Sequence, residues 1–435
     1  MPCTGQIIAM TGSTHAGQAV ATASDASVVA PALPWSAGRS RRTWAYPATT
    51  GDRDLRIDFL RGLAVLFVVV DQIDIASLFH LISHERIGVV SGAELFVVLS
   101  GIVLGMVHRR RAIDEGWRSV ATRMWSRALL LYVTCIAVIL AAYAISFLPF
   151  VDGDVLTTWT DAGSGTTDPM YLTTPLLRDY PVPPQAVLDI LFLNVGPYQF
   201  NVIGLYVVLL CLAPLAFQLL LRGRWWIVAG LSWGVYAANM ALHVRLFPSQ
   251  FEGPFPLLTW QVLFFSGMVA GFYWKPITGW FDRPTGRMTM IVAVVLALAF
   301  IFYAWNNPGL AQDPFGLRLS IIPQETFETI YESWFQRDSL GILRVANVAV
   351  LVTVAYALLS RCWVPLNRAL GWLLVPLGSA TLYVFILHLL FVLIAGSLPA
   401  LQGASVWTNT AAHTVIILSL WLMVKNRVFY RWIPR

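Results

Sequence analysis

Long apolar runs separated by short polar segments dominate the chain. From residue 62 onward each run is long enough, or nearly so, to cross a bilayer, which takes about 20 apolar residues. The runs cover about 62–82, 88–107, 128–149, 201–221, 225–242, 257–274, 289–305, 341–361, 373–397 and 406–424. This pattern predicts an all-α fold: a polytopic helix bundle with about ten transmembrane helices.

The polar segments alternate in charge. Arg and Lys cluster before the first run and in every second gap, while the intervening gaps are acidic or neutral. The positive-inside rule therefore predicts that both termini are cytoplasmic. Two of the outer loops, 150–200 and 306–340, are long, and loops of that length usually carry function. We expect them to form a cap over an outward-facing cleft, although they could also serve only as connections.

Composition agrees with a membrane protein. Of the 435 residues, 57% are hydrophobic and 12% are charged, about half the charged fraction of a soluble domain. The net charge of +6 comes from Lys and Arg between the apolar runs, a pattern typical of membrane topology and not of nucleic-acid binding. We therefore expect a multi-pass protein of a cell membrane, with the lipid bilayer as its first partner.

The first 50 residues differ from the rest. They are rich in Ala, Ser, Thr, Gly and Pro and show no helical periodicity. This composition predicts a disordered cytoplasmic tail over 1–50 and one transmembrane domain over 51–435.

Several apolar runs contain ionisable residues. Asp71 and Asp74 lie in the first run, Glu94 in the second and His388 in the ninth. A charged side chain at membrane depth costs on the order of 3 kcal/mol, so such residues usually line a polar cavity. Helical rise places Asp74, Glu94 and His388 within about 10 Å of the outer face. We expect them to meet in one polar chamber, where Arg344 neutralises a carboxylate; the alternative is a purely structural salt-bridge network.

Two glycines in the second run, Gly101 and Gly105, are four residues apart. This spacing lets a neighbouring helix approach closely and predicts helix packing. The sequence contains no cluster with metal-ligand spacing, so no metal site is predicted.

Five sequence blocks occur in a recognisable order: RDLRIDFLRGLAVLFVVVD, SGAELFVVLSGIVLGMVHRR, FNVIGLYVVLLCLAPL, TWQVLFFSGMVAG and LGSATLYVFILHLLF. Together they resemble the OpgC-type membrane proteins, relatives of the membrane acyltransferase type 3 superfamily. The resemblance implies a bundle of about ten helices that transfers an acyl group, succinyl in the named case, to a sugar hydroxyl of an envelope glycan or periplasmic glucan. It also implies an acyl-CoA donor reached from the cytoplasm and no bound cofactor.

One position departs from the family pattern. The family's first helix carries Asp-His where this chain has Asp71-Gln72, and the resemblance makes that histidine the expected general base. Glutamine cannot accept a proton at neutral pH. His388 matches another family position and is our preferred replacement base, with Asp71 or Glu94 orienting it.

Further residues are assigned to substrate and donor binding. Arg123 and Arg127, in the basic segment between the second and third runs, suit the phosphates of acyl-CoA, although such charge also sets topology. The remaining predicted binding residues are Arg61, Trp260, Gln261 and Arg344.

Two other functions stay open. Because Gln72 lacks the chemistry of the family histidine, the chain could be a catalytically silent relative that binds or moves a glycan or lipid-linked intermediate. Buried acids would also suit a proton-coupled transporter, but the sequence shows no inverted repeat.

Overall fold

The computed structural model describes residues 46–50, 53–73, 75–83, 85–145, 148, 154–157, 184–309, 316–431 and 433. The chain divides into two units, Met1–Arg42 and Thr43–Arg435, and all described residues belong to the second.

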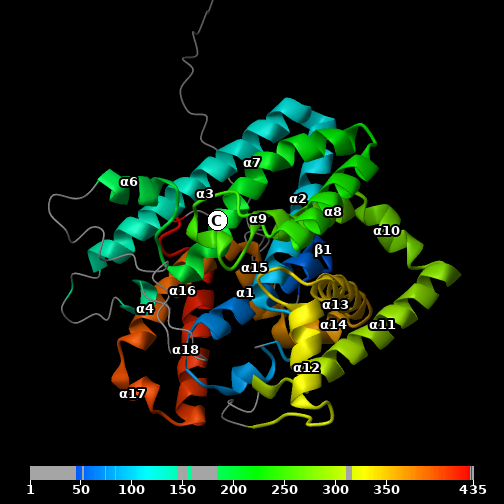
Figure 1. Ribbon diagram of the computed structural model, residues 1–435. Coiled ribbons are helices and arrows are strands. Elements are labelled where there is room, and N and C mark those ends of the chain that lie inside the picture. Colours follow the sequence, from blue (N-terminus) through cyan, green and yellow to red (C-terminus); the bar gives the residue numbers. More distant parts are fainter. Residues whose placement is uncertain are drawn as a thin grey trace, which may run out of the picture. The chain divides into compact units, whose positions relative to one another are not determined.

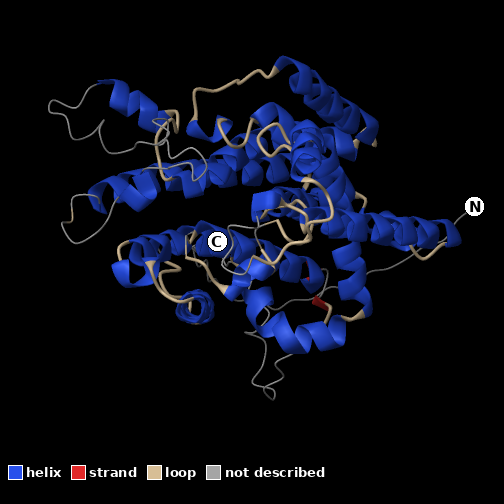
Figure 2. Cartoon of the chain, turned by 60° about the horizontal axis from the view of Figure 1, so that its bottom comes forward, coloured by secondary structure: helices blue, strands red, loops and turns tan. Residues whose placement is uncertain are grey.

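Helices make up almost all of the described structure (Figures 1 and 2). A single antiparallel strand pair precedes the first helix, with β1 (Thr49–Thr50) facing β2 (Arg53–Asp54). The longer helices are α1 (Leu55–Gln72), α2 (Gly92–Glu115), α3 (Trp117–Ile145), α7 (Asn201–Leu221), α8 (Trp225–Leu242), α9 (Leu257–Phe272), α11 (Pro284–Ala304), α13 (Ile342–Arg361), α16 (Thr381–Gly396) and α18 (Val406–Lys425). The shorter helices are α4 (Asp154–Thr157), α6 (Pro184–Leu191), α10 (Trp274–Trp280), α12 (Gln324–Ile330), α14 (Trp363–Leu366), α15 (Trp372–Ser379) and α17 (Pro399–Gln402). Single turns are η1 (Leu78–Leu81), η3 (Tyr198–Phe200), η4 (Gln250–Glu252), η6 (Tyr331–Phe335) and η7 (Asn367–Gly371).

Six described helices, α2, α3, α7 (with η3), α11, α13 and α18, are long and apolar enough to cross a membrane. Two bent pairs raise that number to eight if each pair is one span: α9 with α10, bent by 79°, and Trp363–Ser379 with α16, bent by 95°. The all-α membrane bundle is thus confirmed. Ten spans and the cytoplasmic location of the termini stay predictions.

The first predicted helix is wrong at its far end. A helix over 62–82 is expected, but α1 ends at Gln72 and Ile73 is extended. Ser77 begins the separate turn η1, in which its backbone N–H donates to His80 Nδ1. This local capping contact competes with continuation of the helix. Asp71 and Gln72 therefore occupy the last turn of α1 and not its middle.

The sequence predicts one continuous helix over 373–397, and this prediction is also wrong. It breaks at Ala380, between α15 and α16. A Gly-Ser pair, Gly378 and Ser379, precedes the break, and the Ser379 hydroxyl donates to the carbonyl of Pro376. Such pairs, together with a proline, are common causes of sharp kinks.

Close packing of α15 on α1 depends on glycine. A Cβ at Gly378 would lie 1.7 Å from the Asp58 carbonyl oxygen, and one at Gly62 would lie 2.0 Å from that of Leu374. Neither position has room for a larger residue. This crossing fixes where α16 begins, and therefore where its side chains meet the end of α1.

The helix packing expected around Gly101 and Gly105 is confirmed. These glycines of α2 contact α9, which contributes a second pair at the same spacing, Gly267 and Gly271. A Cβ at Gly101 would lie 2.2 Å from the Phe264 carbonyl oxygen. Small residues on both helices let the two backbones touch.

Most of the predicted tail cannot be compared with the structure. Residues 1–45 lie outside the described residues, but the Tyr46 carbonyl accepts hydrogen bonds from Trp363 Nε1 and Asn367 Nδ2. Residues 46–50 thus pack on the membrane domain. The helix expected within the loop 306–340 is present as α12 and η6, whereas most of 150–183 lies outside the described residues.

The α2–α9 crossing gives the first prediction. Gly271→Ala should lower the free energy of unfolding by about 1–3 kcal/mol, because its Cβ would lie 2.0 Å from the Ile102 carbonyl oxygen and overpacking has costs of that size. Thermal unfolding of the purified protein in detergent measures the change. The matched control is Gly230→Ala in α8, where nothing lies within 4 Å and alanine should stabilise the helix slightly. Equal effects of the two substitutions would contradict the close crossing.

Candidate functional site

His388 and Gln72 contact each other where α16 passes the last turn of α1. His388 is fully buried and Gln72 is partly exposed. The ring atom Nε2 lies 2.5 Å from Gln72 Oε1, and Nδ1 lies 2.5 Å from the Phe385 carbonyl oxygen. The Gln72 amide donates to the Gln199 carbonyl at 3.2 Å. Gln72 thus contacts His388. Gln72 stands where the family's first helix carries a histidine, and His388 is the residue predicted to replace that histidine as the base.

These contacts constrain the protons on the imidazole. Both ring nitrogens of His388 face oxygen acceptors, and a neutral imidazole has only one N–H to donate. The Gln72 amide group is committed to the Gln199 carbonyl, which leaves its oxygen for His388. The protonated ring satisfies both acceptors at once. Protonation would, however, place a charge on a ring with no exposed surface, which burial disfavours.

A second polar centre surrounds Arg344 of α13. Its side chain is fully buried and forms ion pairs with Glu94 at 2.6 Å and Glu85 at 2.5 Å. Its Nε also donates to the Phe335 carbonyl at 2.8 Å. One guanidinium thereby joins α2, the segment before it, α13 and η6. Bridging two carboxylates and a carbonyl suits arginine because its guanidinium has several donors in a fixed planar arrangement.

Glu94 is stabilised from its own helix as well. It lies in the first turn of α2, where the helix dipole favours negative charge. The Ser91 backbone N–H and hydroxyl both donate to Glu94 Oε2. The carboxylate is thus fully engaged by Ser91 and Arg344.

Tyr331 is a further member of this second centre. Its hydroxyl accepts from Arg344 Nη2 at 3.2 Å. Burial raises the pKa of the Tyr331 phenol above its ordinary value, with the nearby Glu85 carboxylate adding to the effect. The phenol therefore stays neutral and adds no further negative charge beside the two acids.

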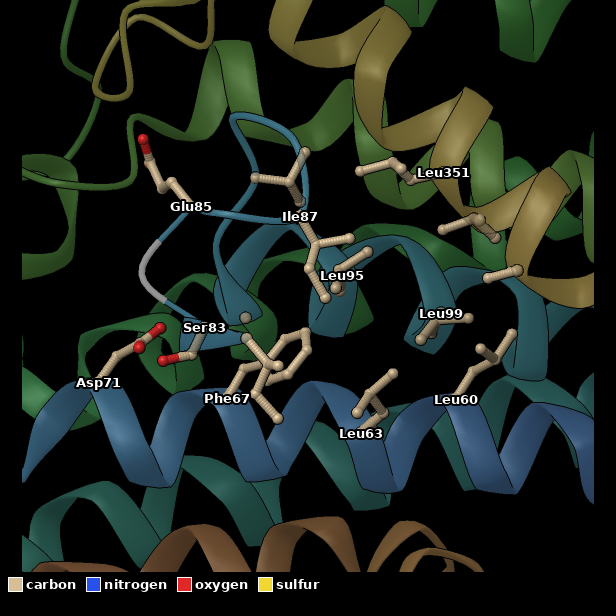
Figure 3. Close-up of a pocket in the computed structure, with 15 residues that line it drawn as sticks. Leu60, Leu63, Phe67, Asp71, Ser83, Glu85, Ile87, Leu95, Leu99 and Leu351 are labelled. Carbon is tan, nitrogen blue, oxygen red and sulfur yellow. The ribbon is translucent and has the colours of Figure 1, made fainter. Parts of the chain in front are cut away.

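Asp71 faces a groove on another side of α1. The groove has a volume of about 100 Å³, and α1, α2, α13 and the segment 82–90 line it. Figure 3 shows Asp71 and Ser83 close together at one end, with leucines along the remainder. Asp71 and Gln72 are neighbours on α1, yet Asp71 lines the groove and Gln72 contacts His388.

Arg61 lies in the first half of α1. It donates to the Thr381 hydroxyl at 2.6 Å, at the start of α16. Its Nη1 is 3.7 Å from Asp58, which is the local ion pair that the sequence spacing favours. Arg53 also pairs with Asp58, at 2.6 Å.

The other predicted binding residues have different surroundings. Arg123 forms an exposed pair with Glu115 at 2.7 Å, and Arg127 is partly exposed on the same helix, α3. Trp260 is fully buried against Phe255. Gln261 links α9 to α8: its oxygen accepts from the Ser232 hydroxyl at 2.6 Å, and its amide donates to the Ser232 carbonyl. The surroundings of Trp260 and Gln261 are those of structural residues.

The single chamber predicted for Asp74, Glu94 and His388 stays a prediction. Glu94 and His388 have separate sets of partners, given above, and Asp74 lies outside the described residues. Two contributors were not foreseen, Glu85 and Gln199. Glu85 has a positive φ of 59° in an irregular segment, and Gln199 acts through its backbone carbonyl, so neither has a periodic signal in the sequence.

Comparisons with known proteins identify a family. The family model described as OpgC protein matches residues 53–432, which includes every described helix from α1 to α18. Neither the curated proteins nor the solved structures contain a match.

The buried Arg344 centre gives the second prediction. Arg344→Met should cost about 3–5 kcal/mol of stability, because it leaves Glu94 buried without a counter-charge. Adding Glu94→Gln should restore part of the loss. Thermal unfolding in detergent measures both variants.

Arg123→Met provides the matched control. It breaks an ion pair of nearly the same length, 2.7 Å, between side chains that are 52% and 40% exposed. Exposed pairs contribute at most about 1 kcal/mol. If Arg123→Met and Arg344→Met destabilise equally, burial is not what gives the Arg344 centre its importance.

Proposed function

The chain belongs to the OpgC protein family, and on that premise we propose that it is a membrane acyltransferase acting on a sugar hydroxyl of an envelope glucan. The donor is an acyl-CoA, with succinyl as the first acyl group to test. The observation that carries the proposal is the contact between His388 and Gln72. It supports a catalytic centre in which the histidine comes from α16, next to residue 72, where the family's first helix carries its own histidine.

His388 acts as the general base. It takes the proton of the acceptor hydroxyl while that oxygen attacks the thioester carbonyl. The new O–C bond forms, the C–S bond breaks, and the proton on His388 passes to the departing CoA thiolate. The Phe385 carbonyl oxygen, 2.5 Å from Nδ1, accepts the N–H on that side of the ring during this sequence.

Gln72 is a positioning residue in this mechanism. For His388 to abstract a proton, the acceptor hydroxyl must take the place of Gln72 Oε1 at Nε2. Gln72 is more exposed than the fully buried ring, so a substrate entering from solvent displaces the glutamine first. Its amide remains anchored to Gln199 or turns aside with the glycan.

The basic residues serve the donor. Arg61, Arg123 and Arg127 are proposed to bind the phosphates of acyl-CoA, because guanidinium groups bind phosphate in a bidentate manner. Of these three residues, Arg61 is the one that contacts α16, through Thr381 at the break between α15 and α16. It is therefore the proposed phosphate-binding residue that lies on the same helix path as His388. The acyl chain would reach His388 along α16. The protein is multi-pass, and for this reaction we place it in the bacterial inner membrane.

A second candidate follows from the same contact. Gln72 occupies Nε2 of His388, and a permanently occupied nitrogen cannot act as a base. The protein would then bind or move a glycan or lipid-linked intermediate without acylating it. Gln72→His separates the candidates: acyl transfer that appears only in this variant favours the silent relative.

The third prediction tests the base. Membranes containing the protein should transfer label from succinyl-CoA, or another acyl-CoA, to glucan, and His388→Ala should lower the rate about 10²–10⁴-fold. The matched control is His243→Asn at the exposed end of α8, where φ is 51°, a conformation that asparagine tolerates. Unchanged transfer by His388→Ala, in protein that remains folded, would remove His388 from the mechanism.

A further inference from the structure

We propose that a small pocket between α3, η3, α7 and η4 binds the hydroxymethyl group of a neutral hexose and is a subsite for the acceptor glucan. In this subsite the side-chain amide of Asn201 holds the oxygen of the hydroxymethyl group. The inference rests on the proposed function for the identity of the acceptor, but sugar binding in the pocket can be measured without any acyl transfer.

The pocket lies where four elements meet. α3 and α7 run side by side (Figure 1), and the lining includes Ile139 of α3, Phe200 of η3, Asn201 of α7, and Gln250 and Phe251 of η4. Both η3 and η4 belong to gaps between apolar runs that are predicted to lie on the outer side, where an envelope glucan would arrive. The volume is about 20 Å³. Because a water molecule needs about 10–15 Å³, one small group fits and a whole sugar ring does not.

The amide of Asn201 is a buried donor without a hydrogen bond. Asn201 lines the pocket and is 7% exposed, and its Nδ2 has no partner among the described residues. A buried donor in this state is unfavourable, and an oxygen that accepts from it would remove the penalty. The unpaired amide therefore favours a ligand that brings an acceptor oxygen into the pocket.

The lining disfavours a charged ligand. Its polar side chains include the carboxamides of Asn201 and Gln250, and none of the described lining residues is charged. Because a buried charge without a counter-charge is strongly unfavourable, a neutral oxygen is favoured over a carboxylate or a phosphate.

A hydroxymethyl group fits the mixture of polar and apolar atoms in the lining. Its carbon can lie against apolar side chains such as Ile139 and Phe251, while its oxygen accepts from the Asn201 amide. A ring hydroxyl is attached directly to the sugar ring and reaches less far into so narrow a pocket. The exocyclic carbon of a hexose is therefore the part of a glucan that suits this pocket best.

The turn η3 connects the pocket to the His388 contact in two ways. The Gln199 carbonyl accepts from the Gln72 amide at 3.2 Å. The ring centroid of Phe200 lies 6.1 Å from that of Phe385, and the Phe385 centroid lies 5.2 Å from that of the His388 imidazole. A sugar anchored in the pocket would therefore lie beside the turn that contacts both neighbours of the proposed base.

Two matched sugars test the pocket. Methyl β-glucoside and methyl β-xyloside differ only by the hydroxymethyl group. Their binding to the full-length protein is measured by saturation-transfer difference NMR in lauryl dimethylamine oxide, a detergent without a sugar headgroup. The glucoside should bind about two- to tenfold more tightly, the ratio that one hydrogen bond provides, with the strongest saturation at its C6 protons. Equal binding of the two sugars, or binding of neither, would overturn the proposal and leave the pocket with an ordered water only.

Asn201→Leu separates sugar binding from folding. Leucine has the branching of asparagine but no amide, so this variant should lose the preference for the glucoside. Its melting temperature should stay equal or rise, because an unpaired buried donor has been removed. The matched control is Asn239→Leu in α8, because Asn239 is 6% exposed and its Oδ1 accepts from the Val244 backbone N–H at 2.8 Å. The control should melt at a lower temperature and keep the preference; the opposite pattern would make Asn201 a structural residue.

A filling variant repeats the test from a different helix. Cys135→Leu places a larger side chain in the lining from α3 and should reduce glucoside binding to the level of the xyloside. Cys211→Leu makes the same change at an exposed position and should leave the preference unchanged. A preference that persists in both folded variants, Asn201→Leu and Cys135→Leu, would contradict the assigned pocket.

Kinetics distinguish failure of the subsite from failure of the proposed function. Where acyl transfer to glucan is observed, Asn201→Leu should raise KM for the glucan about two- to tenfold with kcat nearly unchanged, whereas His388→Ala should lower kcat. A glucoside preference in a protein that transfers no acyl group would support the subsite and contradict the proposed function. Acyl transfer without a glucoside preference would contradict the subsite alone.

Discussion

The ion cluster around Arg344 is the interaction on which the described structure at this end of the bundle depends. A guanidinium with no exposed surface is held between Glu94 and Glu85. In a medium of low dielectric, each of these charges alone would be strongly unfavourable. Together they fix the start of α2, the segment before it, α13 and η6 in one arrangement. The segment between α1 and α2 joins this cluster through Glu85.

The position of His388 depends on a different constraint, the close contact between α1 and α15. Because Gly62 and Gly378 let the backbones touch, α15 lies directly against α1, and the break at Ala380 turns α16 by 95° relative to the helix before it. Residue 388, two turns further on, then faces the end of α1. A straight helix in place of this bent pair would not present that side chain to Gln72 in the same way. The contact of His388 with Gln72 is thus a consequence of backbone packing at glycine positions some distance away.

Sequence patterns predicted the elements far better than their ends or their partners. The run at 201–221 coincides with α7, and that at 225–242 with α8, because their apolar stretches end at polar or glycine residues. The expected first helix was too long because IDIASLF continues the apolar pattern beyond Gln72, whereas the capping contact at Ser77 is local and outweighs it. Arg344 was foreseen as a counter-charge because a buried arginine requires an acid. Its pairing with Glu85 was not, since that residue's place depends on a left-handed backbone conformation in an irregular segment.

The last turn of α1 joins the two polar features on either side of it. Successive residues on a helix point about 100° apart, since there are 3.6 residues per turn. Asp71 therefore faces the groove while Gln72 faces His388, and no residue lies between them in the sequence. Any shift of this turn moves both side chains together. The lining of the groove and the orientation of Gln72 at the imidazole are consequently linked through a single helical turn, which ends where Ile73 becomes extended.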